Sequence, residues 1–257
     1  MNLLRHLLFY FLLLGAVFGA ANAAANSEYE QALAAWENVL KTYVDDQGRT
    51  DFKSLATNRK DIDFIVSVIA NFGPQSNPDY FDNKDKILAY HINTYNVLAM
   101  HGVIDEGIPK AFNSFFKRAG FFRFRKVLLD GESTNLYDYE NKVIRKFNEP
   151  RIHFALNCMV KDCPRLPQEP FRAETLESQL ETAAQEFFSK KVHFFRNAEK
   201  SEVWVSEILD FYTEDFAASG KAKDLIPYLN SYLDPAVPND WRVRFIDYDW
   251  TINQQPN

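Results

Sequence analysis

The segment from Lys84 to Asp105 constrains the fold more than any other part of the chain. Its apolar residues follow helical spacing, but they are distributed around the whole helix and do not form one stripe. A helix of this kind is buried on most sides. The sequence therefore predicts a central helix that other elements cover. Its apolar residues are Ile87, Leu88, Ile92, Val97, Leu98, Met100, Val103 and Ile104.

Three polar residues, Asn93, Asn96 and His101, lie within this segment. If they are buried, each polar group left without a partner costs roughly 1 to 3 kcal/mol. Buried asparagines usually brace neighbouring backbone, because buried polar groups are as a rule hydrogen-bonded. The alternative is that one of them orients a catalytic group or lines an oxyanion pocket.

The start of the chain predicts a secretory signal peptide over residues 1–23. A positively charged start precedes an apolar run, Leu7 to Ala20, and a small-x-small cleavage pattern follows. The run is too short for a comfortable membrane span, which needs about 20 residues. No later uncharged segment approaches that length. We therefore expect a periplasmic or secreted protein that begins near Ala24 and has no transmembrane anchor in the mature chain.

The charge of the chain argues against a nucleic-acid partner. The formal net charge is -6, and 15% of the residues are aromatic. Nucleic-acid-binding domains present a basic field, which this composition does not supply. The one basic cluster, Lys117 to Lys126, is interleaved with phenylalanines. A half-buried strand with solvated charges is its more ordinary interpretation, and a surface that binds anions or polysaccharide is the alternative.

The pattern of the remaining chain predicts a single α+β domain over residues 24–257, with helices packed around a small, mostly antiparallel sheet. It would consist of a helical lead-in at about 27–75, a core at about 84–216 and a closing segment at about 222–253. Besides the central helix, we expect helices at 28–43, 61–71, 136–147, 171–190 and 211–216, and strands at 121–129, 152–157, 192–195, 203–205 and 241–250.

The segment Arg151 to Pro164 contains the only two cysteines of the chain, Cys158 and Cys163. Its alternating pattern predicts a strand that runs into a turn. On a straight strand, His153 and Cys158 would be on the order of 16 Å apart. A nucleophilic Cys158 would therefore need a base from another element, unless the chain folds back sharply at Asn157.

Three roles of the cysteines remain open at this point. In an oxidising compartment they can form a disulfide, which would stabilise the small loop by roughly 2 kcal/mol. A free Cys158 with a lowered pKa or a nearby base could instead attack an acyl group. Metal binding is the third role, but the spacing is not that of a standard zinc site and no fourth ligand is indicated. We therefore expect no metal and no cofactor.

Five segments, in order along the chain, resemble the domain-of-unknown-function 547 family. They are the segments around 92–98, 135–145, 151–158, 163–164 and 245–253. The resemblance implies a protein that is often secreted or periplasmic. It also implies a role for Cys158 and for His153, five residues before it. Two positions depart from the family pattern: His91 replaces a tryptophan, and Asn141 stands where many members have a histidine.

The leading functional hypothesis is a cysteine-dependent hydrolase or acyl transferase that acts on a small molecule or a peptide. Cys158 would attack an amide or ester carbonyl, and His101 or His153 would accept the proton. Glu140 or Asn93 would orient that histidine or the oxyanion. The rival hypothesis is a non-catalytic binding or assembly module in which the two cysteines form a structural disulfide.

Overall fold

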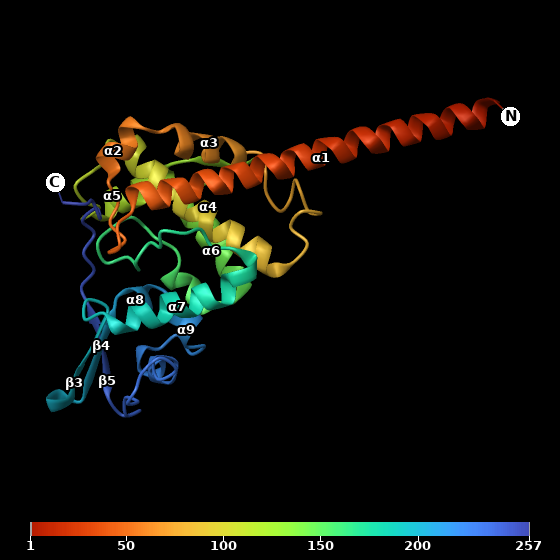
Figure 1. Ribbon diagram of the computed structural model, residues 1–257. Coiled ribbons are helices and arrows are strands. Elements are labelled where there is room, and N and C mark those ends of the chain that lie inside the picture. Colours follow the sequence, from red (N-terminus) through yellow and green to blue (C-terminus); the bar gives the residue numbers. More distant parts are fainter. Residues whose placement is uncertain (1, 257) are drawn as a thin grey trace.

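A long N-terminal helix, α1 (Asn2–Tyr43), leads into the body of the protein, which Figure 1 shows as a computed structural model. The structure describes residues 2–256, and the side chains of residues 22–256. The signal peptide predicted for residues 1–23 therefore falls almost entirely outside the described side chains. Within the described part, no helix has both the length and the apolar character needed to cross a membrane.

The fold is a mixed α+β arrangement with two small sheets, which confirms the predicted class. Strands β1 (Val127–Leu129) and β2 (Glu132–Thr134) form an antiparallel hairpin. In the second sheet, β4 (Glu202–Ser206) lies between β3 (Phe194–Asn197), to which it is antiparallel, and β5 (Arg242–Ile246), to which it is parallel. The second sheet lies at the end of the molecule away from α1 (Figure 1).

The helix α4 (Lys84–Asp105) lies at the centre of the larger hydrophobic core, as its apolar pattern predicts. Every residue from Leu88 to Met100 is buried. The side chain of Asn83 begins the helix by accepting a hydrogen bond of 2.9 Å from a backbone N–H of the first turn. Helices α1 and α3 (Lys60–Ile69) pack against each other and contribute to the same core.

A second and smaller core lies between α7 (Leu176–Ser189), the second sheet and the short helices that follow it. Phe154 and Phe187 belong to this core, and their ring centroids are 4.6 Å apart. The remaining helices are α2 (Phe52–Thr57), α5 (Phe115–Ala119), α6 (Leu136–Lys142), α8 (Ile208–Phe211), α9 (Thr213–Phe216) and α10 (Ile226–Leu229).

The strand predicted over residues 152–157 is wrong, because a short 3-10 helix, Pro150–Phe154, lies there. The proline fixes the first turn, and the side chain of Glu149 accepts a backbone N–H from that turn at 3.1 Å. The alternation in the sequence has another origin. Ile152 packs into the larger core and Phe154 into the smaller one, so the apolar residues do not share one face of a strand.

The strand predicted over residues 121–129 is also wrong in its first half, which forms a π-helix, Gly120–Phe124. A hydrogen bond of 2.9 Å across five residues closes this wide turn. Phe121 is fully buried, Phe122 is half-buried and Phe124 is exposed. The turn therefore distributes its phenylalanines between the interior and the surface without a strand, and only the second half of the predicted strand forms β1.

Candidate functional site

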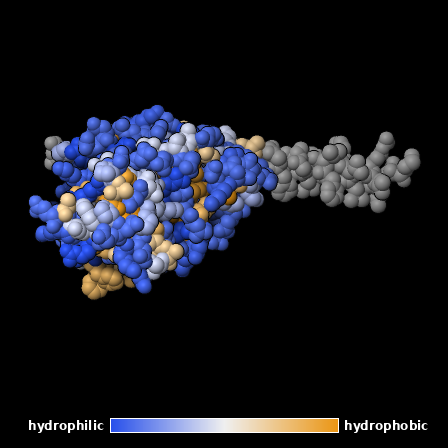
Figure 2. All heavy atoms as spheres, turned by 90° about the horizontal axis from the view of Figure 1, so that it is seen from below, coloured by the Kyte–Doolittle hydropathy of each residue, from blue (hydrophilic) through white to orange (hydrophobic). Residues whose placement is uncertain are grey.

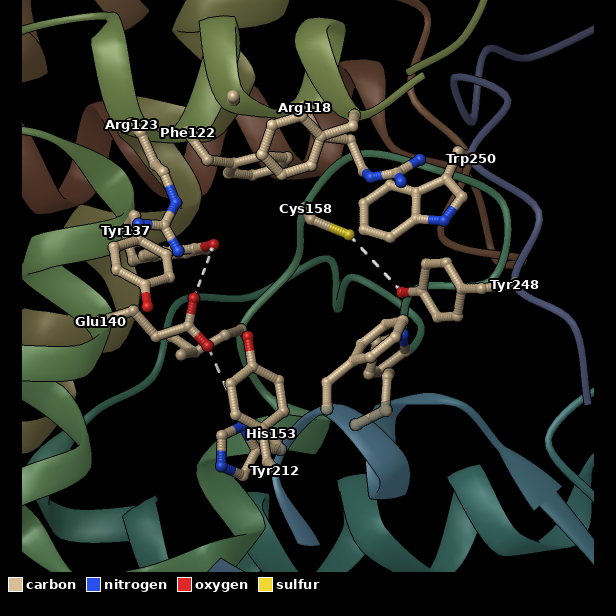
Figure 3. Close-up of a pocket in the computed structure, with 17 residues that line it drawn as sticks. Arg118, Phe122, Arg123, Tyr137, Glu140, His153, Cys158, Tyr212, Tyr248 and Trp250 are labelled. Atoms are coloured by element: carbon tan, nitrogen blue, oxygen red, sulfur yellow. Dashed lines mark hydrogen bonds and ion pairs between the residues drawn. The ribbon is translucent and has the colours of Figure 1, made fainter. Parts of the chain in front are cut away.

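A cavity of about 220 Å³ lies where residues of the two cores meet. Figure 3 shows Glu140 of α6 on one side of it, and Cys158, Tyr248 and Trp250 on the other. The walls are mainly aromatic and few polar groups converge on the space, which is the usual form of a small-molecule site. The lining also contains Tyr95, Phe115, Arg118, Phe122, Arg123, Tyr137, His153, Leu156, Ile208, Phe211 and Tyr212.

The two cysteines form a disulfide, which is one of the three roles that the sequence leaves open. Cys163 is buried, whereas Cys158 is half-buried and lines the cavity. The sulfur of Cys158 lies 3.5 Å from the hydroxyl of Tyr248. Because the nucleophilic form of cysteine is the thiolate, Cys158 cannot attack a carbonyl while this bond is closed.

Asn96 and Asn157 hold the backbone on the approach to the disulfide. Asn96 donates to the carbonyl of Ala155 at 3.0 Å and accepts the N–H of Asn157 at 2.7 Å. Asn157 in turn donates to the carbonyl of Pro164 at 2.7 Å and accepts the N–H of Met159 at 2.8 Å. These bonds fix both ends of the loop that carries Cys158, and they fit the bracing role expected of a buried asparagine.

Two of the predicted site residues lie outside this cavity. The amide of Asn93 donates to the carbonyl of Phe171 at 2.7 Å and accepts its N–H at 2.9 Å, so both amide functions are engaged with backbone. The ring of His101 lies 3.0 Å from Asp63 and 3.0 Å from Asp105. The structure therefore brings His153, Glu140 and Cys158 to one cavity, but neither Asn93 nor His101.

His153 lies between two carboxylates at the edge of the cavity. Its Nε2 is 2.7 Å from Oδ2 of Asp215, and its Nδ1 is 4.0 Å from Oε1 of Glu140. An ionised carboxylate only accepts hydrogen bonds, so Nε2 carries the proton in the bond to Asp215. The imidazole also stacks on the ring of Tyr212, with centroids 4.0 Å apart. No hydrogen bond joins His153 to Cys158 within the described residues.

Asp215 is fixed in turn by Arg145, which binds it through Nε at 2.6 Å and through Nη2 at 2.8 Å. Burial favours the neutral form of this carboxyl, but the hydrogen bonds from His153 and Arg145 outweigh it and hold the pKa of Asp215 well below its usual range. Asp215 is therefore ionised near neutral pH. It fixes the imidazole in one orientation and one tautomer.

Glu140 is buried and accepts a hydrogen bond from the hydroxyl of Tyr95 at 3.2 Å. Burial, and then the nearby charge of Glu140, raise the pKa of Tyr95 and of Tyr212. Both phenols therefore remain protonated near neutral pH, and the hydroxyl of Tyr95 stays a donor to Glu140. Among the described residues that line the cavity, Glu140 is the one acidic side chain.

The comparisons with known proteins concern the middle of the chain. Residues 80–188 match the family model described as "Protein of unknown function, DUF547". This DUF547 segment contains α4, Glu140, His153 and both cysteines, so the family resemblance is confirmed for this part of the chain. The similar segment at 245–253 lies outside the match. No curated protein and no solved structure gives a significant match.

Several residues of the site were not predicted from the sequence, and most of them lie outside the DUF547 segment. Asp215 and Tyr212 come from the α8–α9 region, and Tyr248 and Trp250 follow β5. The signal available in the sequence was the aromatic and acidic run from Phe211 to Phe216 and the closing segment 245–253. Neither pattern indicated that its side chains reach the cysteine loop.

Proposed function

We propose that the cavity binds a small organic molecule with an apolar or aromatic body and an amine or amide N–H group that donates to Glu140. The observation that carries this proposal is that Glu140 is the one buried carboxylate, among the described residues, in a cavity with mainly aromatic walls. A charge-assisted hydrogen bond to such a group is strong because little water competes for it. While the disulfide is closed, Cys158 has no free thiol, and this supports ligand binding over thiol chemistry as the function of the oxidised protein.

Two arginines at the cavity favour ligands that also contain a carbonyl, such as amides and peptides. The guanidinium of Arg118 lies over the ring of Trp250 at 4.8 Å, and that of Arg123 lies over the ring of Tyr137 at 3.5 Å (Figure 3). Each guanidinium has five N–H donors, and the ring contact does not use them. A carbonyl oxygen of the ligand can therefore accept a hydrogen bond here, while its N–H group faces Glu140.

Binding is tested with two indole compounds that share one aromatic body and differ in the charge at the end of the side chain. Calorimetric titration is expected to show that tryptamine, a cation, binds at least about tenfold more tightly than indole-3-propionate, an anion. Glu140→Gln should remove this preference. As a control, Glu106→Gln changes an acidic residue outside the cavity and should retain it. Tighter binding of the anion, or no binding of either compound, contradicts the proposal.

A second candidate function, the cysteine hydrolase or acyl transferase, is favoured by one observation. The exposed side of the disulfide is Cys158, and its sulfur faces the same cavity as His153 and Glu140. Reduction of the disulfide would convert Cys158 into a thiol, and the ordered pair of His153 and Asp215 would then be the base nearest to the cavity.

The hydrolase proposal predicts activity only after reduction. In the presence of dithiothreitol, the protein should hydrolyse a p-nitrophenyl ester with Cys158-dependent burst kinetics, and Cys158→Ser should abolish the burst. Cys163→Ser is the matched control, because it also removes the disulfide but leaves the Cys158 thiol in place. Equal rates for the two variants would exclude nucleophilic catalysis by Cys158.

We also propose that the protein works in the periplasm or outside the cell. The disulfide supports this proposal, because disulfides persist in oxidising compartments and are rare where thiols are kept reduced. The apolar run at the start of the sequence is a second, independent argument.

A further inference from the structure

The basic segment Lys117 to Lys126 contributes only Arg118 and Arg123 to the ligand proposal, and its other basic side chains have no role there. From residue 107 to residue 129 the chain contains six basic residues and no acidic one, although its net charge is -6. The six are Lys110, Lys117, Arg118, Arg123, Arg125 and Lys126. Six of the 29 lysines and arginines of the chain thus lie in one short segment that has no acidic residue.

The same segment carries the three most exposed phenylalanines among the described residues. Phe115 is 68% exposed, Phe116 is 83% exposed and Phe124 is 74% exposed. Figure 2 shows an apolar group that protrudes from the edge of a mostly hydrophilic face. Full exposure of a large aromatic ring is unfavourable in water, so three such rings on one short segment mark an interaction surface.

Local structure explains why these rings point outwards. Helix α5 and the π-helix after it use Ala119 and Phe121 as their buried contacts, and Phe121 packs on Phe112 with centroids 4.5 Å apart. The anchoring contacts leave Phe116 and Phe124 on the outer side. The segment is therefore held by its inner residues, and its outer rings are not required for the core.

The charges of the segment are also largely unpaired. Arg125 forms an ion pair with Asp105 at 2.8 Å. In the part of the chain that the structure describes, no carboxylate lies within ion-pair distance of Lys117, Arg123 or Lys126. All three side chains are exposed. They can therefore interact with an external anion without first breaking an ion pair within the protein.

We propose that the segment Phe115–Lys126 docks on an anionic membrane surface. Phenylalanine rings enter the boundary between headgroups and acyl chains, and neighbouring lysines and arginines bind the anionic headgroups. A soluble polyanion would use the cations but would leave the rings in water, so the combination favours a lipid surface. Phe115, Arg118 and Phe122 also line the cavity, so docking would turn the cavity towards the membrane.

Binding to vesicles tests this proposal with side chains that do not line the cavity. In sedimentation with the full chain, vesicles that contain phosphatidylglycerol should bind the protein and pure phosphatidylcholine vesicles should bind it much less. The double variant Lys117→Gln/Lys126→Gln should weaken binding at least about tenfold. Phe116→Ser/Phe124→Ser should weaken it by about tenfold or more, because the rings no longer enter the interface. Added salt should weaken binding of the wild type.

A matched control uses Lys191→Gln/Val192→Ser, which removes one exposed cation and one exposed apolar side chain between α7 and β3. It should bind vesicles as the wild type does. The N-terminal apolar run is the same in all variants. Hydrogen exchange provides a second measurement, since anionic vesicles should protect Phe115–Phe124 from exchange.

Three outcomes would overturn the proposal: no preference for anionic vesicles, wild-type binding by both segment variants, or no protection of the segment. Binding to soluble dextran sulfate that is as strong as binding to vesicles, and that does not depend on Phe116 and Phe124, would also overturn it and would indicate a polysaccharide surface. The substituted side chains do not line the cavity, so vesicle binding and tryptamine binding are tested independently. If the vesicle experiment contradicts membrane docking, the ligand proposal is unaffected.

Discussion

Between about pH 7.5 and about pH 5, the free energy of unfolding is expected to fall by about 4 kcal/mol, because two buried histidines remain neutral in the folded protein. Burial lowers the pKa of His91 to about 4, although nearby Asp130 acts in the opposite direction. Burial and the charge of Lys190 lower the pKa of His193 to about 3, against the effect of Glu186.

The direction follows from proton uptake. In the unfolded chain both imidazoles bind a proton as the pH falls through about 6.5, whereas in the folded protein they do not until the pH approaches their lowered pKa values. Above about pH 6.5 both states keep the imidazoles largely neutral, so burying them costs no free energy of protonation. Below that pH only the unfolded chain gains from binding protons, and the free energy of unfolding falls progressively. Urea unfolding followed by circular dichroism at several pH values measures this loss.

His193→Phe isolates one of the two contributions. The ring of His193 stacks on Phe187 with centroids 4.1 Å apart, and its Nδ1 has no hydrogen-bond partner among the described residues. Phenylalanine can keep the stacking without a titrating group. The variant should be at least as stable as the wild type near neutral pH, and its loss on acidification should be about half as large. If the full loss persists in this variant, burial of His193 is not its origin.

Asn96→Ala is expected to lower the free energy of unfolding by about 3 to 4 kcal/mol, because it leaves two buried backbone groups without partners. These groups are the carbonyl of Ala155 and the N–H of Asn157, which now bind the Asn96 amide. The loss of these bonds should also release the loop of Cys158. We expect faster reduction of the disulfide by dithiothreitol and weaker tryptamine binding.

Asn93→Ala is the matched control for the second part of this prediction. Asn93 is on the same helix and also binds one backbone N–H and one carbonyl, both of Phe171, but it does not line the cavity. It should destabilise the protein by a similar amount and leave the rate of disulfide reduction unchanged. Asn71→Ala, at an exposed position, should change stability by less than about 0.5 kcal/mol. Equal effects of the Asn93 and Asn96 variants on disulfide reduction would contradict a specific role of Asn96.

The elements that the sequence predicts well are those with local signals. The central helix was predictable because its apolar residues surround it, and because Gly107 and Pro109 follow its end at Asp105. The pairing of β3 with β4 was predictable for a similar reason, since a short turn joins two short β-prone runs. The last part of helix α1, predicted over 28–43, has a similar local signal in its three- and four-residue apolar spacing.

The segment before the cysteines was mispredicted because its burial comes from two directions. Alternating apolar residues predict a strand only where one face is buried and the other is exposed. Here Ile152, His153 and Phe154 are all buried: Ile152 packs into the larger core, whereas His153 and Phe154 both contact Phe216 of the smaller core. The straight-strand distance between His153 and Cys158 therefore had no basis, and both side chains line one cavity.

The partners of His153 were not predictable for a different reason. Asp215 lies 62 residues further along the chain, and nothing in its local sequence identifies its partner. Three candidate residues, Cys158, His153 and Glu140, nevertheless line the cavity, and the first two had been indicated by the family resemblance. Residue types suggest which groups can react, but only tertiary packing determines which of them meet.

The segment after β5 runs back along the molecule and joins parts that are far apart in sequence (Figure 1). Thr251 pairs with Ala111, Ile252 with Val160 and Gln254 with Thr50. Tyr248 and Trp250 belong to this closing segment and line the cavity, so one wall of the cavity depends on contacts between residues that are far apart in sequence. The closing segment thus acts as a strap that ties the lead-in, the α4–α5 connection and the cysteine loop together beside the cavity.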